Sequence, residues 1–289
     1  MVLLVVKRGD ENQFLYETDV NKTVDEVVLD IVSIFNGRLK VSRICFELEE
    51  LAKHGTFLPA EMMGLTDEQI QELKLEDPWA KKCAPPGYVF EKDPMGRRCG
   101  FAPPENMREV LKKAGETAKE IIHKKLVDIG KCLTQKEVSR ALDELRGATK
   151  IVFPAGLPPH DPVRQELDNV EDLTGTQAAL EVIDPAKACI WTCGKKMLSG
   201  NQLCDHLGKN NKTKIVAKLC SSGEGAPGRE PILTEEDRKQ LMLKAYRKQE
   251  EWKKLEQDDD DHYLDSKWAD GGNLKKQLHG LNNISWRPK

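Results

Sequence analysis

Two cysteines and a histidine near residue 200 are the side chains of this sequence that come nearest to a reaction centre. Cys193 and Cys204 lie upstream of His206, and a cysteine nucleophile needs a general base within hydrogen-bond reach. A thiol-dependent enzyme is therefore a remote alternative for the function. Closeness in the sequence supports it weakly, and no Ser/His/Asp arrangement or pair of acidic residues suggests other catalysis. The sequence predicts no catalytic residues and favours a protein that is not an enzyme.

Three further patterns resemble ligand sites, but each lacks a residue that such a site needs. Residues 208–213 (GKNNKT) end like a phosphate-binding loop, but asparagine replaces the glycine before Lys212. The four aspartates at 258–261 lack the glycine and the distal glutamate of a calcium loop. The eight cysteines include no C-x-x-C pair, which indicates reduced structural thiols rather than a zinc site. No cofactor and no metal ligand is expected.

The composition favours a soluble intracellular protein. Of the 289 residues 32% are charged, and the formal net charge is only −3, so nothing attracts nucleic acid or an anionic membrane. The apolar run at residues 2–6 is shorter than the core of a signal peptide. No stretch approaches the ~20 apolar residues of a membrane span. We therefore expect a cytoplasmic protein that binds neither nucleic acid nor membrane.

The start of the chain predicts a hairpin followed by a helix. Residues 2–8 and 13–18 are apolar runs with a polar turn between them, which is typical of a β-hairpin. Residues 24–35 follow a capping box and carry apolar side chains at helical spacing. Gly37 is expected to end this helix in a left-handed cap. Hairpin and then helix is the opening of a β-grasp, or ubiquitin-like, domain.

Residues 188–219 have the pattern of the second half of such a domain. They predict a strand, a turn, a short helical turn and a second strand, at 189–193, 194–197, 202–207 and 213–219. A helix over 185–198 is the alternative, because Asp184-Pro185 is a good N-cap and first helical position. The strand is the favoured interpretation.

The predicted fold class is α+β: a ubiquitin-like β-grasp domain, interrupted by a large, mostly helical insertion and followed by a helical C-terminal tail. The insertion is expected to contain helices over 39–51, 105–129 and 135–146, capping boxes at Thr66 and Thr134, and a long proline-rich loop at 77–104. The predicted parts are the first half of the β-grasp domain, the insertion, the second half, and a linker with a charged helix and an aromatic-containing tail, at 1–36, 37–185, 186–220 and 221–289.

Aromatic side chains on polar segments are the candidate partner contacts, because a few buried aromatics carry most of the energy of a protein interface. The C-terminal part contributes Trp252, Tyr263, Trp268 and Trp286. The rigid turn at 154–162 (PAGLPPHDP) adds Pro158 and His160. An alternative for the tryptophans is a tail that covers the protein's own core.

Long segments of the chain resemble the Kurly family of cilia- and flagella-associated proteins. Among them are FNGRLKVSRICFELEELAKHG, FPAGLPPHDPVRQEL, EDLTGTQAALEVI and EDRKQLMLKAYRKQEEWKKLEQDDD. The resemblance runs in register from Met1 to Lys289, and the segments are long and distinctive. It covers essentially the whole chain.

The resemblance implies a role in motile cilia. It implies a non-enzymatic adaptor in the cytoplasmic preassembly of axonemal outer dynein arms, located in the cytoplasm and around the basal body. It also implies roles in cilium motility, cilium positioning and planar cell polarity. The implied partners are dynein arm assembly factors, including a MYND-type zinc-finger protein, and axonemal dynein chains. A structural protein resident in the axoneme or basal body is the alternative.

Overall fold

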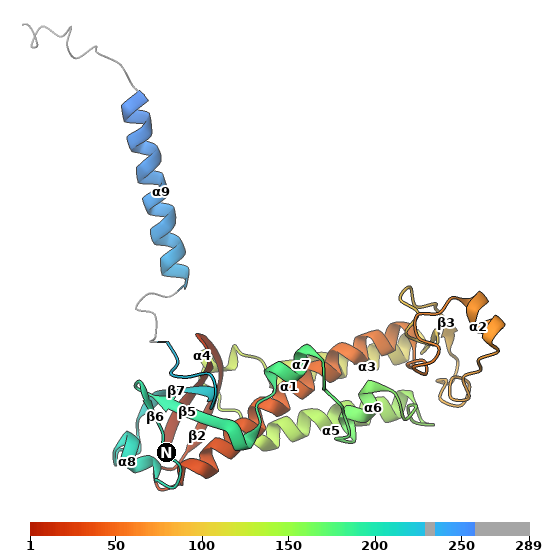
Figure 1. The fold of residues 1–289 in the computed structure, drawn as a ribbon, viewed down its shortest axis with the longest axis horizontal. Coiled ribbons are helices and arrows are strands. Elements are labelled where there is room, and N and C mark those ends of the chain that lie inside the picture. The colour runs from red at the N-terminus through yellow and green to blue at the C-terminus, as the bar shows by residue number, and fades with distance from the viewer. Residues whose placement is uncertain (229–234, 258–289) are drawn as a thin grey trace, which may run out of the picture. The chain divides into compact units, whose positions relative to one another are not determined.

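The computed structural model describes residues 1–228 and 235–257 (Figure 1). Internal contacts divide the chain into two units, Met1–Arg229 and Glu230–Lys289. The fold is α+β, since the first unit combines a five-stranded sheet with several helices. The second unit is described over one helix, α9 (Glu235–Gln257). None of the described helices is both long and apolar enough to cross a membrane.

Both ends of the first unit contribute strands to one sheet. The strand order is β2-β1-β7-β5-β6. The strands are β1 (Val2–Arg8), β2 (Glu11–Thr18), β5 (Ala188–Thr192), β6 (Lys195–Lys196) and β7 (Lys214–Ser221). β1 is antiparallel to β2 and parallel to β7, with Leu3 opposite Lys214. The predicted hairpin is confirmed, and so is the prediction of two strands in the downstream segment.

The segment around Asp184 satisfies part of both interpretations of its sequence. The Asp184 side chain accepts a hydrogen bond from the Ala186 backbone N–H at 3.0 Å, as an N-cap does. The helix that it begins is a single 3₁₀ turn, η1 (Pro185–Lys187), after which β5 starts. The strand prediction is therefore confirmed and the longer helix is wrong, because β5 pairs along its length with β7.

The sheet buries apolar side chains on both of its faces. Leu4 and Leu219 point into the main core. Val5, one residue along β1, lies in a smaller cluster with Val127, since successive side chains of a strand point to opposite faces. Val127 belongs to the short helix α4 (Leu126–Ile129), so α4 covers part of the second face.

One long helix, α1 (Val24–His54), starts beside the sheet and continues beyond it. The prediction that Gly37 ends this helix is wrong. A Cβ at Gly37 would lie 2.7 Å from Cγ1 of Val138 on a neighbouring helix, so glycine here permits close helix packing. The helix ends instead at Gly55, whose φ of 77° suits glycine. The predicted boundary between residues 36 and 37 therefore falls inside α1.

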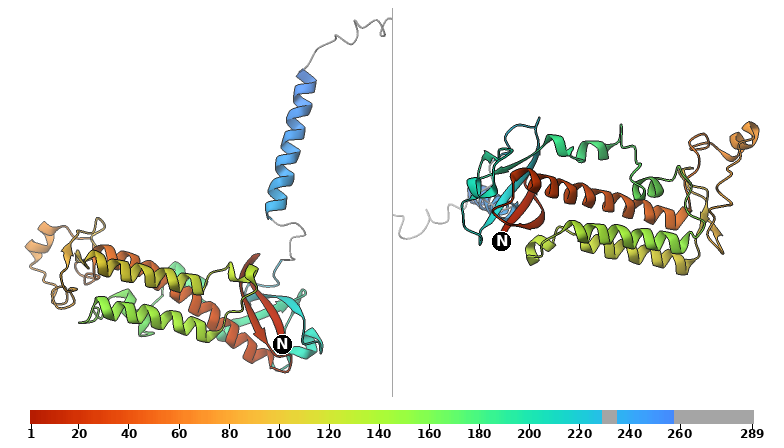
Figure 2. Two further views of the ribbon diagram at one scale, coloured as in Figure 1. Left: turned by 180° about the vertical axis from the view of Figure 1, so that it is seen from behind. Right: turned by 90° about the horizontal axis from the view of Figure 1, so that it is seen from below.

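Two further helices pack on the far part of α1 and form a bundle with it (Figure 2). They are α3 (Glu105–Ile121) and α5 (Gln135–Val152). Leu48, Leu111 and Leu145, one from each helix, are almost fully buried in the same core as the sheet. The predicted continuous helical stripe over 105–129 is divided, because α3 ends at Ile121 and α4 is a separate turn.

The remaining elements are short. They are α2 (Asp67–Leu73), β3 (Val89–Phe90), β4 (Phe101–Ala102), α6 (Pro162–Leu167), α7 (Gln177–Glu181) and α8 (Leu203–Leu207). The capping boxes predicted at Thr66 and Thr134 are present at the starts of α2 and α5. The proline-rich segment 77–104, predicted as loop, also contains the antiparallel pair of β3 and β4.

Two glycine-to-alanine substitutions test the packing role of Gly37. We expect Gly37→Ala to lower the free energy of unfolding, because overpacking a core costs about 1–3 kcal/mol against a helix-propensity gain of about 1 kcal/mol. The matched control is Gly147→Ala, on the exposed side of α5 with no neighbouring heavy atom within 4 Å of a Cβ. The control should gain stability. Urea unfolding measures both, and equal gains would contradict the close packing of α5 on α1.

Candidate functional site

The end of the bundle that lies away from the sheet exposes a group of large apolar side chains. We call residues 55–104 the tip (Figure 1). Its exposed large apolar residues are Met63, Leu73, Trp79, Tyr88, Val89, Phe90 and Met95. Aromatic and methionine side chains are enriched in protein interfaces. The tip is therefore the candidate interaction surface of the first unit.

Three aromatic rings of the tip form one contiguous cluster. Tyr88 and Phe90 each meet Phe101 edge to face, with ring centroids 4.8 Å and 6.1 Å away. Phe90 is 65% exposed and Tyr88 is 50% exposed, whereas Phe101 lies half-buried beneath them. The cluster presents apolar area whose conformational freedom is already reduced, which lowers the entropy cost of binding.

Buried Arg98 attaches the tip to α1. Its Nη1 donates to the Gly55 carbonyl at 2.8 Å, and its Nη2 donates to Glu47 Oε2 at 2.5 Å. Its guanidinium also lies 4.6 Å from the centroid of the Phe57 ring. Burial raises the pKa of Glu47 although Arg98 opposes this effect. The Arg98 side chain thus joins the end of α1 to two segments of the tip, the one that contains Gly55 and Phe57 and the turn that carries Arg98 itself.

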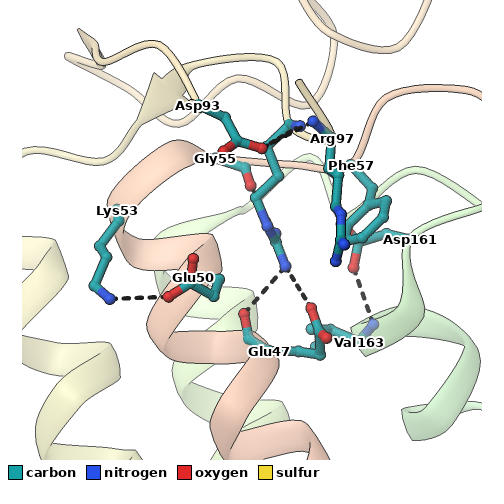
Figure 3. A network of polar contacts seen from close by, with 10 residues as sticks. Glu47, Glu50, Lys53, Gly55, Phe57, Asp93, Arg97, Asp161 and Val163 are labelled. Atoms are coloured by element: carbon teal, nitrogen blue, oxygen red, sulfur yellow. Dashed lines mark hydrogen bonds and ion pairs between the residues drawn. The ribbon is translucent and has the colours of Figure 1, made fainter. Parts of the chain in front are cut away.

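Asp161 is completely buried. It is the N-cap of α6 and also binds the tip near Arg98. Its Oδ2 accepts a hydrogen bond from the Phe57 N–H at 3.1 Å, and its Oδ1 accepts one from the Val163 N–H at 3.0 Å (Figure 3). His160 Nε2 lies 2.9 Å from the Phe57 carbonyl oxygen. Burial raises the pKa of Asp161 against the lowering effect of these backbone bonds and of Arg98.

Asp93 organises the turn that carries Arg98. Its carboxylate accepts three backbone hydrogen bonds, from Met95 at 2.9 Å, Arg97 at 2.8 Å and Arg98 at 3.1 Å. Burial by itself raises the pKa of Asp93, but the three backbone N–H groups outweigh it and the pKa lies below its usual value. The carboxylate therefore holds the turn best when it is ionised.

The structure does not join the cysteines and the histidine of the remote thiol alternative. Cys193 is exposed at a two-residue turn between β5 and β6, where Cys193 and Gly194 both have positive φ. Cys204 contacts the side chains of Gln202 and Asp205. His206 Nε2 accepts from the Leu198 N–H at 3.3 Å. No hydrogen bond within the described residues joins His206 to either cysteine, and these residues contain no cluster of three potential metal ligands.

The structure places some of the predicted contact residues and not others. Trp252 lies on α9 and is 61% exposed, with Lys248 Nζ 5.5 Å from its ring centroid. Tyr263, Trp268 and Trp286 lie outside the described residues. The surface role predicted for Pro158 does not agree with its burial. His160 is half-buried, and its ring contacts the tip through the Phe57 carbonyl.

The residues that hold the tip were missed in the sequence, although two of them carry local signals. Asp161-Pro162 is an N-cap followed by proline at the first helical position, the same pattern as Asp184-Pro185. Asp93 begins a turn that has glycine at its fourth position, a known turn signature. Arg98 has no such signal, because its partner Glu47 is 51 positions away in the chain.

Gly55→Ala tests whether the close approach at the end of α1 holds the tip. The φ of 77° disfavours alanine, and a Cβ would lie 2.3 Å from the Phe101 carbonyl oxygen. We expect faster proteolysis within the tip and a free energy of unfolding lower by at least about 2 kcal/mol. The matched control is Gly87→Ala, with a φ of 71° and no neighbouring atom within 4 Å. Equal effects of the two variants would contradict the role of the close approach.

The lowered pKa of Asp93 predicts a pH-dependent contribution to stability. The contribution is complete above the unfolded-state pKa, which is about 3.9, and is lost as the pH falls through the lower folded-state pKa. Asp93→Asn should therefore lower the thermal unfolding midpoint at pH 7, and the difference from wild type should shrink at pH 3. A difference that stays constant between the two pH values would show that ionisation of Asp93 is not involved.

The geometry of the tip does not identify a protein family, whereas comparison with known proteins does. A family model described as cilia- and flagella-associated protein 298 matches residues 188–284. The chain is 55% identical over 290 residues to cilia- and flagella-associated protein 298 of Homo sapiens, and the matched region covers all of both chains. It is 54% identical over 288 residues to the Drosophila melanogaster protein of that name, with 99% of each chain covered.

A protein of Xenopus laevis, cilia- and flagella-associated protein 298-B, is 47% identical over 290 residues and is also covered in full. No solved structure matches the chain. The similarity to these relatives extends over the sheet, the bundle, the tip and the C-terminal part alike. The chain belongs to the cilia- and flagella-associated protein 298 family.

Proposed function

We propose that this protein is a non-enzymatic adaptor in the cytoplasmic preassembly of axonemal outer dynein arms. Membership of the family implies a role connected with cilia and flagella. The proposal adds the stage and the partners: dynein arm assembly factors, including a MYND-type zinc-finger protein, and axonemal dynein chains. Loss of the protein would then affect cilium motility, cilium positioning and planar cell polarity through defective dynein arms and basal bodies.

The observation that carries the proposal is similarity to the ciliary relatives over the full length of the chain. None of these relatives is named for an enzymatic activity. A location in the cytoplasm and around the basal body fits a protein that acts on dynein arms before they reach the axoneme. The structural protein resident in the axoneme is the second candidate and is separated from the first by the experiment below.

The tip supports an adaptor function by its construction. Its exposed aromatic cluster is built on Phe101, and Arg98 and Asp161 attach the tip backbone to the bundle. A surface that is ordered before binding loses less conformational entropy when a partner arrives. α9 also exposes Leu241 and Trp252. These two side chains lie on one face, because eleven residues make about three helical turns, and they offer a second contact with apolar anchors.

We also propose that the sheet and α1 form a β-grasp domain of ubiquitin-like topology. The support is the strand order β2-β1-β7-β5-β6, with parallel β1 and β7 at the centre and α1 following the first hairpin. Residues 55–183 then form an excursion between α1 and β5 that builds the bundle and the tip. The β-grasp assignment concerns the fold, and the function is argued from the surfaces alone.

Capture from ciliating cells tests the adaptor function and the tip together. The tagged protein is compared with the double variant Tyr88→Ser, Phe90→Ser, and recovery is measured separately in the cytosolic and axonemal fractions. We expect dynein chains and assembly factors with the cytosolic wild type, and at least about tenfold less with the variant. The thermal unfolding midpoint should change little, because Tyr88 and Phe90 are 50% and 65% exposed and lose only their edge-to-face contacts with Phe101.

The matched control is the double variant Ile129→Ser, Val170→Ser, which removes two apolar side chains that are 77% and 73% exposed outside the tip. It should capture partners as wild type does. Unchanged capture by the Tyr88 and Phe90 variant would exclude the tip as the contact, and Trp252→Ala then tests α9. Recovery mainly with axonemal tubulin would contradict the preassembly role and favour the structural protein.

A further inference from the structure

A pocket where the sheet meets the bundle contains a buried arginine. Side chains from β1, β2, α1, α7 and the segment after α3 enclose about 380 Å³, a volume within the range of small-ligand sites. Arg38 of α1 lines this pocket although only 7% of it is exposed. Leu180 of α7, which is 81% exposed, lines it too.

Arg38 differs from the other basic residues of the pocket in having no acidic partner. Arg8 is paired with Glu224 at 2.7 Å, and Lys124 is paired with Glu11 at 2.5 Å. No acidic side chain among the described residues pairs with Arg38, and burial alone lowers its pKa to about 10. The guanidinium is therefore still charged at neutral pH, and a buried charge without a counter-ion is costly.

Part of the Arg38 guanidinium has a structural role. Its Nε donates to the Ile122 carbonyl, just after the end of α3, at 3.1 Å, and its Nη1 donates to Gln13 Oε1 at 3.3 Å. The guanidinium carbon lies 5.5 Å from the centroid of the Phe14 ring. These contacts tie α1 to α3 and to β2, and they account for the position of the side chain.

The structural role leaves donors unused. Nη2 forms no hydrogen bond with the described residues, and it is not one of their fully buried unpaired atoms. Arg38 lines the pocket, so Nη2 is the guanidinium nitrogen that is left to bind a ligand there. A positioned guanidinium edge with free N–H groups in the lining of a pocket is a recognition group for an oxyanion.

We propose that this pocket binds a carboxylate group, with Arg38 as the residue that recognises it. A carboxylate is planar and carries one negative charge, so it matches the guanidinium fork and compensates the single unpaired charge. A phosphate dianion fits less well, because Glu11 and Glu181 also line the pocket and would repel a second charge. The carboxylate can belong to a small organic acid or to an acidic side chain of a partner protein.

Chemical-shift titration of the full chain labelled with ¹⁵N tests the site. The arginine Nε–Hε signals are followed while sodium acetate, sodium phosphate or sodium chloride is added at constant ionic strength. We expect a saturable shift of the Arg38 signal with acetate and a weaker response to phosphate and chloride. The blocked peptide acetyl-Gly-Glu-Gly-amide distinguishes the sources: if it binds, an acidic side chain is accepted, and if only acetate binds, the ligand is a small acid.

Two variants on α7 keep the test independent of folding. Leu180→Glu places a competing carboxylate beside the pocket and should weaken acetate binding at least tenfold. Glu181→Gln removes a repelling charge and should tighten it about threefold. Both side chains are exposed, so the thermal unfolding midpoint should stay constant. Arg38→Lys keeps the charge but not the fork, and the backbone amide signals of the pocket residues should show that it binds acetate at least tenfold more weakly.

The control Ile129→Glu adds the same charge at a residue that is 77% exposed and does not line the pocket. It should leave acetate binding unchanged. The proposal is overturned if the Arg38 signal shows no saturable response to acetate, if phosphate binds more tightly than acetate, or if Leu180→Glu binds acetate as wild type does.

Discussion

The packing of α1 against two different layers is the constraint on which the rest of the first unit depends. The helix spans Val24–His54, about 46 Å at 1.5 Å per residue. Its first turns share a core with the sheet, and its later turns share a core with α3 and α5. Because the helix is continuous through Gly37, the sheet and the bundle are held in a common orientation. A break at that position would separate them.

Two buried arginines of this framework differ in whether a carboxylate compensates their charge. Arg98, at the far end of α1, has the Glu47 carboxylate at 2.5 Å and a carbonyl of the tip as partners. Breaking such a pair by removing one partner is strongly destabilising, because the other charge remains buried. Arg38, near the sheet, has carbonyl, amide and aromatic neighbours but no carboxylate. The charge of Arg98 is thus compensated within the fold, whereas Arg38 retains an unpaired charge.

The tip and the pocket of the first unit therefore suit different kinds of contact. The tip offers exposed aromatic area held by a polar network, which suits a protein surface with hot spots. The pocket beside the sheet offers one charged group of defined geometry, which suits recognition of a single chemical group. The proposed adaptor function requires separate surfaces, and the tip begins about 25 Å along α1 from Arg38.

Local patterns in the sequence determined the elements that depend on neighbouring residues. The hairpin at the start, the strands near residues 190 and 216, and the caps at Thr66 and Thr134 all follow from side chains within a few positions of each other. Membership of the ciliary family is likewise a property of the sequence, since it rests on identity along the whole chain. Asp161 belongs to this class too, because its capping pattern involves only neighbouring residues.

The tertiary structure alone decided whatever depends on residues far apart in the chain. Gly37 has the local signature of a helix end, but the approach of Val138 makes it a packing position within α1. Arg98 meets Glu47, and Arg38 meets Gln13 and Ile122, only after the bundle has folded. The physical reason is the same in each case: the energy of a buried charge or of a close helix contact depends on which surfaces enclose it. That enclosure comes from segments that the local sequence does not specify.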